Sequence, residues 1–230
     1  MSLIKATLIT PIWKRDKFKP ILESIVTNQT YQNIEHIIVE EQSSVNYKFK
    51  NARHIIIPSV DNKSLNIGRK RNIALHYSTG DVIINIDSDD YYSPQYVEKV
   101  MNFFQKNQST NFLNMKTMCV YDINIQTYQI LSGRSCFGTG HSYRSSITTK
   151  YDSKKMCGED GDFLSKYIER YGRDGLIETN ALVKDMIYIR HKENISWLAP
   201  LEQFDVDYKF LTSRVADSSI INFYKNYSKG

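Results

Sequence analysis

Apolar residues in the first hundred positions recur with two different periods. Short, nearly continuous apolar runs predict strands at residues 3–10, 35–40, 54–57 and 82–86. Between these runs, apolar residues return every third or fourth position, which is the helical period, and the predicted helices cover 16–28, 66–77 and a segment from Pro94 onward. Strands that alternate with helices in this way are typical of an α/β fold with a mostly parallel, Rossmann-like sheet.

The segments between the predicted strands carry helix-start signals. Asp16 and Asn66 belong to the residue types that cap helix N-termini, and we expect them to cap the first two helices. Pro94 stands where a first helical turn tolerates proline. We interpret residues 1–107, with their four predicted strands, as a nucleotide-binding half.

The second half of the chain is less regular. The segments 117–123 and 126–131 are expected to pair as a β-hairpin, and 133–140 to form a loop that contains glycines. A helix is expected at 159–171 and a strand at 181–189. No internal repeat or clear linker divides the sequence. We therefore predict a single domain over residues 1–230, with an α+β half at 108–200 and a C-terminal extension at 201–230.

Composition agrees with a globular protein and limits its partners. Of the 230 residues, 41% are hydrophobic and 24% charged, which is enough apolar material for a core. The net charge of +5 favours phosphate ligands but is too small to indicate nucleic acid. The basic clusters at 14–15 and 69–71 are short, better suited to one diphosphate than to a duplex.

Cysteine usage and hydropathy predict the compartment. The three cysteines, Cys119, Cys136 and Cys157, match neither a disulfide framework nor a zinc site, which favours a reducing environment. No signal peptide and no apolar run long enough to span a bilayer is visible in the sequence. We expect a cytoplasmic protein, either free or peripheral at a membrane, with no transmembrane segment.

Four residues, Asp87-Ser88-Asp89-Asp90, follow the apolar run at 82–86. Three carboxylates this close repel one another unless a positive charge offsets them. Carboxylate oxygens suit Mg²⁺ or Mn²⁺, with ligand phosphates completing the shell. Ligands of open α/β sheets bind beyond the carboxyl ends of the strands, where this cluster is expected. The alternative is a polar turn with helix-capping aspartates.

Three further segments are expected near the same edge of the sheet. Arg15, at the end of the first strand, can bind a phosphate in fork geometry, and Glu41, after the second, can accept a hydrogen bond from a nucleoside. Residues 66–72 open a helix whose free amides and basic side chains favour a diphosphate. Each of the first two segments can equally be an ordinary turn.

The second half adds one acidic segment and one histidine. A carboxylate of Gly158-Glu159-Asp160-Gly161-Asp162 can accept a proton from a substrate hydroxyl, or can simply cap the following helix. His191 follows the last predicted strand and can bind a metal or a phosphate, although a lone histidine is more often structural.

The order of these segments resembles family 2 glycosyltransferases with the GT-A fold. The Asp-x-Asp element is weak evidence alone, whereas the Asn-x-Gly-x-x-Arg-Asn-x-Ala-Leu pattern upstream of it is more specific. The resemblance covers roughly residues 3–197, through the segments 10–15, 40–41, 66–75, 87–90, 159–160 and 190–196.

This resemblance implies transfer of a sugar from a nucleoside diphosphate sugar, with inversion at the anomeric carbon and Mn²⁺ or Mg²⁺ as cofactor. It implies Asp160, with Glu159 beside it, as the catalytic pair, and Asp89, Asp87 and His191 around the metal. The implied donor-binding residues are Thr10, Pro11, Arg15, Glu41, Gly68, Arg71, Asp87 and Ser88.

One departure from the family pattern concerns the nucleoside. Many relatives carry Asp-Asp-Gly-Ser after the second strand, where this chain has Glu40-Glu41-Gln42-Ser43. UDP is favoured by family habit alone, and the implied acceptor is a glycan, glycolipid or glycoprotein.

Two other hypotheses stay open. One is a sugar nucleotidyltransferase, which usually has a glycine-rich loop that is missing after the first strand here. The other is a non-catalytic glycan- or nucleotide-binding module on the same fold.

Overall fold

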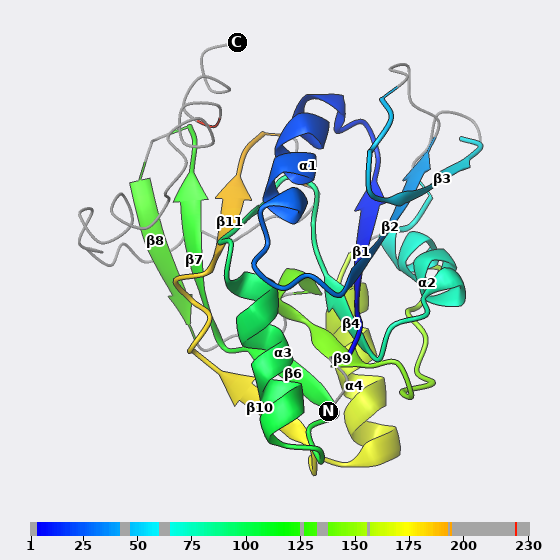
Figure 1. The fold of residues 1–230 in the computed structure, drawn as a ribbon, viewed down its shortest axis with the longest axis vertical. Helices are drawn as coiled ribbons and strands as arrows, with labels where there is room; N and C mark the ends of the chain where they lie inside the picture. Colours follow the sequence, from blue (N-terminus) through cyan, green and yellow to red (C-terminus); the bar gives the residue numbers. More distant parts are fainter. Residues whose placement is uncertain are drawn as a thin grey trace.

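The computed structural model describes residues 4–41, 47–59, 65–124, 127–132, 138–155, 157–192, 194 and 224. Within these residues the larger sheet has seven strands in the order β10-β6-β9-β4-β1-β2-β3 (Figure 1). Its strands are β1 (Ala6–Ile12), β2 (Ile34–Glu41), β3 (Arg53–Ile57), β4 (Val82–Asn85), β6 (Phe112–Met115), β9 (Ser142–Arg144) and β10 (Leu176–Thr179).

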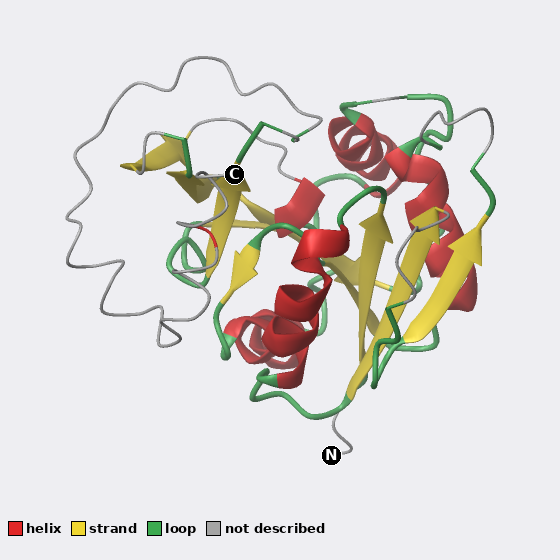
Figure 2. Ribbon diagram, turned by 90° about the horizontal axis from the view of Figure 1, so that it is seen from above, coloured by secondary structure: helices red, strands yellow, loops and turns green. Residues whose placement is uncertain are grey.

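Helices cover both faces of this sheet (Figure 2). One face packs against the first and third helices, and the other against the second and fourth, in two separate apolar clusters. The helices are α1 (Lys19–Thr27), preceded by the short η1 (Asp16–Phe18), then α2 (Ile67–Tyr77), α3 (Tyr96–Lys106) and α4 (Glu159–Tyr171). The α/β class with a mostly parallel sheet, predicted from the sequence, is confirmed.

Strand direction gathers loops from distant parts of the chain at one edge of the sheet. β1, β2, β3 and β4 run parallel, so their carboxyl ends share that edge. β9 runs antiparallel to both β4 and β6, and therefore starts at the same edge. The turn that precedes β9, η2 (Gly138–Gly140), is thereby brought beside the acidic residues that follow β4.

A second sheet brings another part of the chain to this edge. Within the described residues its strand order is β5-β11-β7-β8, formed by β5 (Tyr91–Tyr92), β11 (Met186–Arg190), β7 (Thr117–Asp122) and β8 (Thr127–Ser132). β5 directly follows the acidic cluster and pairs antiparallel with the start of β11. This pairing brings the segment after β11, which contains His191, to the acidic cluster.

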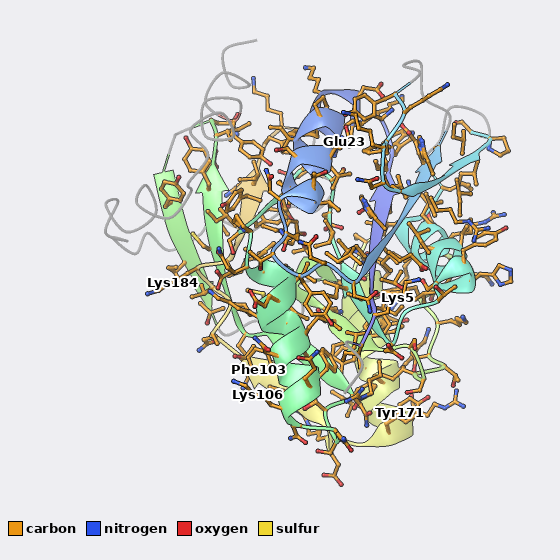
Figure 3. All side chains as sticks on the ribbon, viewed as in Figure 1. Lys5, Glu23, Phe103, Lys106, Tyr171 and Lys184 are labelled. Atoms are coloured by element: carbon orange, nitrogen blue, oxygen red, sulfur yellow. The ribbon has the colours of Figure 1, made fainter. Side chains whose placement is uncertain are left out.

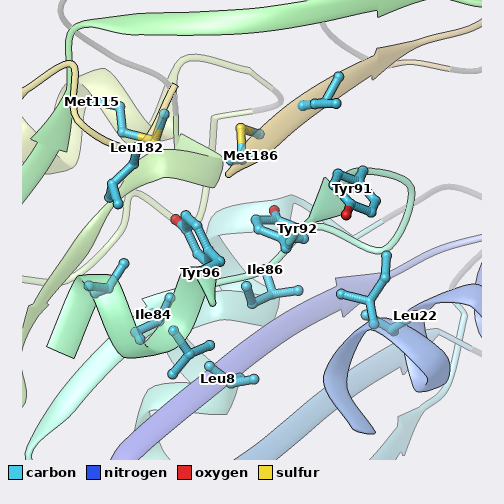
Figure 4. Packing of buried hydrophobic residues seen from close by; sticks show 14 of the residues in the cluster. Leu8, Leu22, Ile84, Ile86, Tyr91, Tyr92, Tyr96, Met115, Leu182 and Met186 are labelled. Carbon is cyan, nitrogen blue, oxygen red and sulfur yellow. The ribbon is translucent and has the colours of Figure 1, made fainter. Parts of the chain in front are cut away.

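Aromatic side chains fill the space between the two sheets. The rings of Tyr92 and Tyr96 lie 5.0 Å apart, and both are buried among residues that include Ile86 and Met186 (Figure 4). The loop between β4 and α3 therefore packs against buried aromatic rings, which limits how far the acidic cluster can move.

Several element boundaries differ from the sequence-based ones. α1 begins at Lys19 with Pro20 in its first turn, and Asp16 starts the preceding 3₁₀ turn, where its carboxylate pairs with Lys19 instead of capping α1. Asn66 precedes α2, but its side chain bonds elsewhere, and Pro94 lies before α3 rather than inside it.

In the second half, the hairpin formed by β7 and β8 and the helix α4 are confirmed. The strand expected at 181–189 begins only at Met186, because residues 181–185 form turns closed by backbone hydrogen bonds such as Asp185 N to Leu182 O. Four strands, β5, β6, β9 and β10, were not predicted from the sequence, because they have only two to four residues each and lack a clear period. The expected loop at 133–140 lies partly outside the described residues.

Some of the charged side chains lie on the surface of the molecule. Lys106 and Lys184 are exposed and lie at the outside of the ribbon (Figure 3). In the part of the chain that the structure describes, no helix has both the length and the apolar character needed to cross a membrane.

Candidate active site

The acidic cluster after β4 faces basic side chains from three other parts of the chain: Arg15, Arg71 and His191. The Asp89 carboxylate oxygen Oδ2 accepts a hydrogen bond from Arg15 Nε at 2.9 Å and lies 3.0 Å from His191 Nε2. Asp87 Oδ1 lies 3.3 Å from Arg71 Nη2. Three residues that were selected separately from the sequence, Arg15, Arg71 and His191, are thus brought to the acidic cluster.

The two aspartates differ in electrostatic environment. Burial raises the pKa of Asp87, although the Arg71 charge opposes this effect. Burial acts in the same direction on Asp89, but the hydrogen bond from His191 and the charge of Arg15 outweigh it, so the pKa of Asp89 is lowered. Asp89 is therefore the carboxylate better able to stay ionised and bind a cation.

Arg71 links the acidic cluster to the start of α4. Its Nη1 lies 2.7 Å from Glu159 Oε1, and the side chain is almost fully buried. Burial disfavours the charged guanidinium, but Asp87, Tyr151 and Glu159 together outweigh burial and raise the pKa of Arg71. The sequence analysis expected Arg71 near the donor phosphates; the structure places it between two carboxylates.

The Asp160 carboxylate is oriented by backbone amides. Gly138 N donates to Oδ2 at 2.7 Å, and Gly161 N donates to Oδ1 at 2.8 Å. Asp160 remains half-exposed, whereas Glu159 is buried against Arg71. Asp162 points to other partners, since its carboxylate pairs with Lys155 and Lys166. Of the three acids, Asp160 combines an oriented carboxylate with partial exposure to solvent.

The glycine of the Asn-x-Gly segment serves close packing. A Cβ atom on Gly68 would lie 2.5 Å from the backbone oxygen of Asp152, so a side chain is not accommodated without movement. Asn66 donates to the backbone oxygen of Ser153 at 2.9 Å, and Asn72 exchanges two hydrogen bonds with the backbone of Tyr151. The segment thus joins α2 to the loop that leads toward α4.

The other residues expected to bind the donor have the following places. Thr10 Oγ1 lies 2.9 Å from His36 Nε2, inside the sheet, and Pro11 is half-buried at the end of β1. Glu41 forms a buried ion pair with Lys70 at 2.6 Å. Ser88 is buried within the acidic cluster. Thr10 and Glu41 therefore shape this part of the site through partners of their own.

Two polar side chains near the acidic cluster were not assigned a role from the sequence. Asp90 is buried, with Thr139 Oγ1 donating to Oδ2 at 3.0 Å and Ile189 N to Oδ1 at 2.9 Å. Burial raises the pKa of Asp90, and these two donors oppose that effect. Asn85 is fully buried and donates to Gly138 O at 2.7 Å. An asparagine inside an apolar strand was the signal that could have identified it.

One pair of these side chains has donor atoms of the kinds that a divalent metal ion accepts. Asp89 Oδ2 and His191 Nε2 converge at 3.0 Å, and an oxygen with an imidazole nitrogen is a suitable donor pair for Mn²⁺. No group of three metal-binding side chains comes together within the described residues, so ligand phosphates would have to complete the shell. Tyr224 lies at the same place, with its hydroxyl donating to the Asp89 backbone oxygen at 3.2 Å.

A family model and several curated proteins match part of this sequence. The family model for glycosyl transferase family 2 matches residues 7–156. An uncharacterized glycosyltransferase of Haemophilus influenzae is 27% identical over 114 residues, which cover 49% of this chain and 39% of that protein. Glycosyltransferase GlyA of Streptococcus pneumoniae is 30% identical over 100 residues, or 41% of this chain and 14% of that protein.

Comparison with solved structures shows the same fold. The crystal structure of Staphylococcus aureus TarS 1–349 in complex with UDP-GlcNAc matches with a TM-score of 0.65 at 16% identity, over 86% of this chain and 62% of that one. The crystal structure of a mycobacterial protein matches with a TM-score of 0.57 at 14% identity, over 83% of this chain and 68% of that chain. The matched part of this chain thus spans less than two thirds of TarS 1–349, and the GT-A type fold expected from the sequence is confirmed.

Proposed function

The chain belongs to glycosyl transferase family 2 and is a glycosyltransferase, and we propose that it transfers a sugar from a UDP-sugar to an acceptor hydroxyl with inversion of the anomeric carbon. The observation that carries this proposal is the joint placement of Asp89, His191 and Asp160 at one edge of the sheet. The first two suit the diphosphate side of a donor, and the third suits an attacking hydroxyl.

Asp160 is the proposed general base. An inverting transfer is a single displacement, so one carboxylate that takes the acceptor proton is sufficient, by analogy with inverting sugar hydrolysis. The amides of Gly138 and Gly161 hold both oxygens of Asp160 in a fixed orientation while the residue stays half-exposed. Glu159 is less suited to this role because Arg71 holds its carboxylate in a buried pair.

Asp89 and His191 are the proposed ligands of Mn²⁺ or Mg²⁺, with Asp87 beside them. The ion, when bound, would neutralise negative charge that develops on the departing diphosphate. Arg15 reaches the same carboxylate oxygen as His191, so its guanidinium lies where it can contribute positive charge next to the ion. Arg71 keeps Asp87 in place through its ion pair with that carboxylate.

The donor and acceptor are proposed by class. Support for UDP comes from the matching TarS structures, which are complexes with UDP-GlcNAc and with UDP. In the proposed donor site, Thr10, Pro11 and Glu41 lie around the nucleoside, and Gly68 and Ser88 near the phosphates. The proposed acceptor is a glycan, glycolipid or glycoprotein hydroxyl. TarS itself is named a poly(ribitol-phosphate) β-N-acetylglucosaminyltransferase, which places a hydroxyl-rich polymer among the acceptors to be screened.

The experiment that tests this proposal measures UDP release with a panel of UDP-sugars and acceptors, followed by ¹H NMR of the product. We expect Mn²⁺-dependent turnover and an anomeric configuration opposite to that of the donor. Asp160→Asn should abolish transfer but leave UDP binding intact, whereas the matched variant Asp162→Asn, on the same turn of α4, should stay active. Retained transfer in Asp160→Asn, or retention of configuration, would contradict the mechanism.

A further inference from the structure

The η2 turn connects three parts of the site that are far apart in sequence. Gly138 N donates to the Asp160 carboxylate, and Gly138 O accepts from Asn85 at the end of β4. The next residue, Thr139, donates to Asp90 in the acidic cluster. The proposed base and the last carboxylate of the acidic cluster are therefore attached to consecutive residues of one turn.

Sterics show that Gly138 fits closely against the base. A Cβ atom there would lie 2.8 Å from Asp160 Cβ, 2.9 Å from Asp160 Oδ2 and 3.0 Å from Arg71 Nη1. Real Cβ atoms essentially never lie closer than 3.0 Å to such neighbours, so a side chain at 138 would require Asp160 to shift. The absence of a side chain is a requirement of the site rather than a feature of a flexible loop.

The hydrogen bonds around Thr139 have a defined direction. The backbone amide of Asp87 donates to Tyr92 Oη at 2.9 Å, and Tyr92 Oη contacts Thr139 Oγ1. Because Thr139 uses its single hydroxyl proton toward Asp90, the Tyr92 hydroxyl must donate to Thr139. The chain of donors therefore runs from Asp87 through Tyr92 and Thr139 to Asp90.

Asp90 closes the connection on its other oxygen. Its Oδ1 accepts from Ile189 N on β11, two residues before His191. Asp90, Tyr92 and Thr139 are all buried, so these bonds form away from solvent, where an unpaired polar group is costly. The third carboxylate of the cluster is therefore committed to internal partners.

We infer that Thr139 and Asp90 are positioning residues, which fix the acidic cluster and the His191 strand at a set separation from the Asp160 base. This inference rests on the proposed function, since it assigns a purpose to the spacing between the donor side and the base. A displacement of about 1 Å between reacting groups can lower a rate about 100-fold, so a rigid connection of this kind has catalytic value.

The test compares Thr139→Val, which keeps the shape but removes the hydroxyl, with Thr139→Ser, which keeps the hydroxyl. Thr110→Val is the matched control, because Thr110 is equally buried and its hydroxyl has no hydrogen-bond partner among the described residues. Hydrogen exchange of the Asp87 and Ile189 amides is measured together with kcat, KM and the Kd for UDP in the presence of Mn²⁺.

We expect Thr139→Val to accelerate exchange of both amides about 10-fold or more, and to lower kcat about 10- to 100-fold with little change in the Kd for UDP. Thr139→Ser should restore both quantities, and Thr110→Val should leave them unchanged. Unaltered exchange in Thr139→Val would overturn the inference whether or not the enzyme turns over. Faster exchange with unchanged kcat would also overturn it, whereas absence of turnover in the wild type would contradict the proposed function instead.

Discussion

Arg71 Nη1 lies 2.7 Å from Glu159 Oε1, although the two residues are 88 positions apart in the sequence. The same guanidinium reaches Asp87, so one buried cation balances two carboxylates from the two halves of the chain. Removing one partner of a buried ionic group leaves the other charges uncompensated, which is more costly than the pair itself is stabilising.

We therefore expect Arg71→Met to lower the free energy of unfolding by about 3–5 kcal/mol. The control is Arg69→Met, an exposed arginine on the same helix, for which a change within about 0.5 kcal/mol is expected. Urea denaturation of both variants gives the measurement. Equal effects of the two substitutions would show that the charges of Asp87 and Glu159 do not depend on Arg71.

Arg15 and a metal ion would compete for the same oxygen of Asp89. Arg15 Nε lies 2.9 Å from Asp89 Oδ2, so nucleotide-free metal binding must overcome this contact. We expect Arg15→Gln to bind Mn²⁺ about three- to fivefold more tightly than the wild type in the absence of nucleotide, as measured from the electron paramagnetic resonance signal of free Mn²⁺.

Lys14→Gln provides the control for this measurement, because it changes the net charge equally at a neighbouring exposed position. Its Mn²⁺ affinity should equal that of the wild type. Weaker Mn²⁺ binding in Arg15→Gln would indicate that Arg15 supports the metal-binding residues rather than competing with the ion.

His36 should make the stability of the protein pH-dependent. Burial, together with the nearby His54, lowers the pKa of His36 to about 3 in the folded protein, against about 6.5 in an unfolded chain. Below pH 6.5 the unfolded state therefore binds a proton that the folded state does not, and stability falls as the pH decreases. This one group lowers the free energy of unfolding by up to about 1.4 kcal/mol for each pH unit below 6.5.

The variant His36→Gln should lose this slope, so the stability difference from the wild type should shrink as the pH falls from 6.5 toward 4. His76→Gln, at an exposed histidine, should keep the wild-type slope. Denaturant titrations at a series of pH values decide the matter. Parallel curves for the wild type and His36→Gln would contradict the assignment of His36 as a neutral buried group.

Variants of the Glu41–Lys70 pair can distinguish a structural role of Glu41 from a nucleoside-binding role. The two side chains are buried 2.6 Å apart, so Glu41→Gln alone should destabilise the protein by leaving Lys70 without its carboxylate. The double variant Glu41→Leu, Lys70→Met should recover most of that stability.

Because the double variant is expected to fold, its affinity for UDP tests whether Glu41 contacts the nucleoside. We expect weaker UDP binding than in the wild type if Glu41 contacts the base or ribose, as proposed. Calorimetry gives the two dissociation constants. Unchanged affinity would restrict Glu41 to its pair with Lys70 and remove it from the donor site.

Much of this architecture could be predicted from the sequence. The strand–helix alternation identified the parallel sheet, because apolar period is a local property of the chain. The acidic cluster and Asp160 could be selected as candidates because clustered acids at element ends are visible without any tertiary information. The expected position of the acidic cluster, at the edge where the parallel strands end, followed from the rule that such strands present their carboxyl ends together.

The remaining features depend on contacts that no local pattern encodes. β9 has three residues and inserts antiparallel between β4 and β6, so its position follows from packing alone. The partner of Arg71 on α4 and the bond between Asp90 and Thr139 join residues 88 and 49 positions apart. For the same reason the acid that holds the turn, Asp90, could not be told apart from its neighbour Asp89.

The most direct test of the account is a calorimetric titration of the protein with UDP and with GDP, each with and without Mn²⁺. We predict that UDP binds only when Mn²⁺ is present, that GDP binds more weakly, and that Asp89→Asn abolishes the metal-dependent binding while Asp162→Asn retains it. UDP binding that is indifferent to Mn²⁺, or that survives in Asp89→Asn, would contradict the proposed metal-dependent donor site.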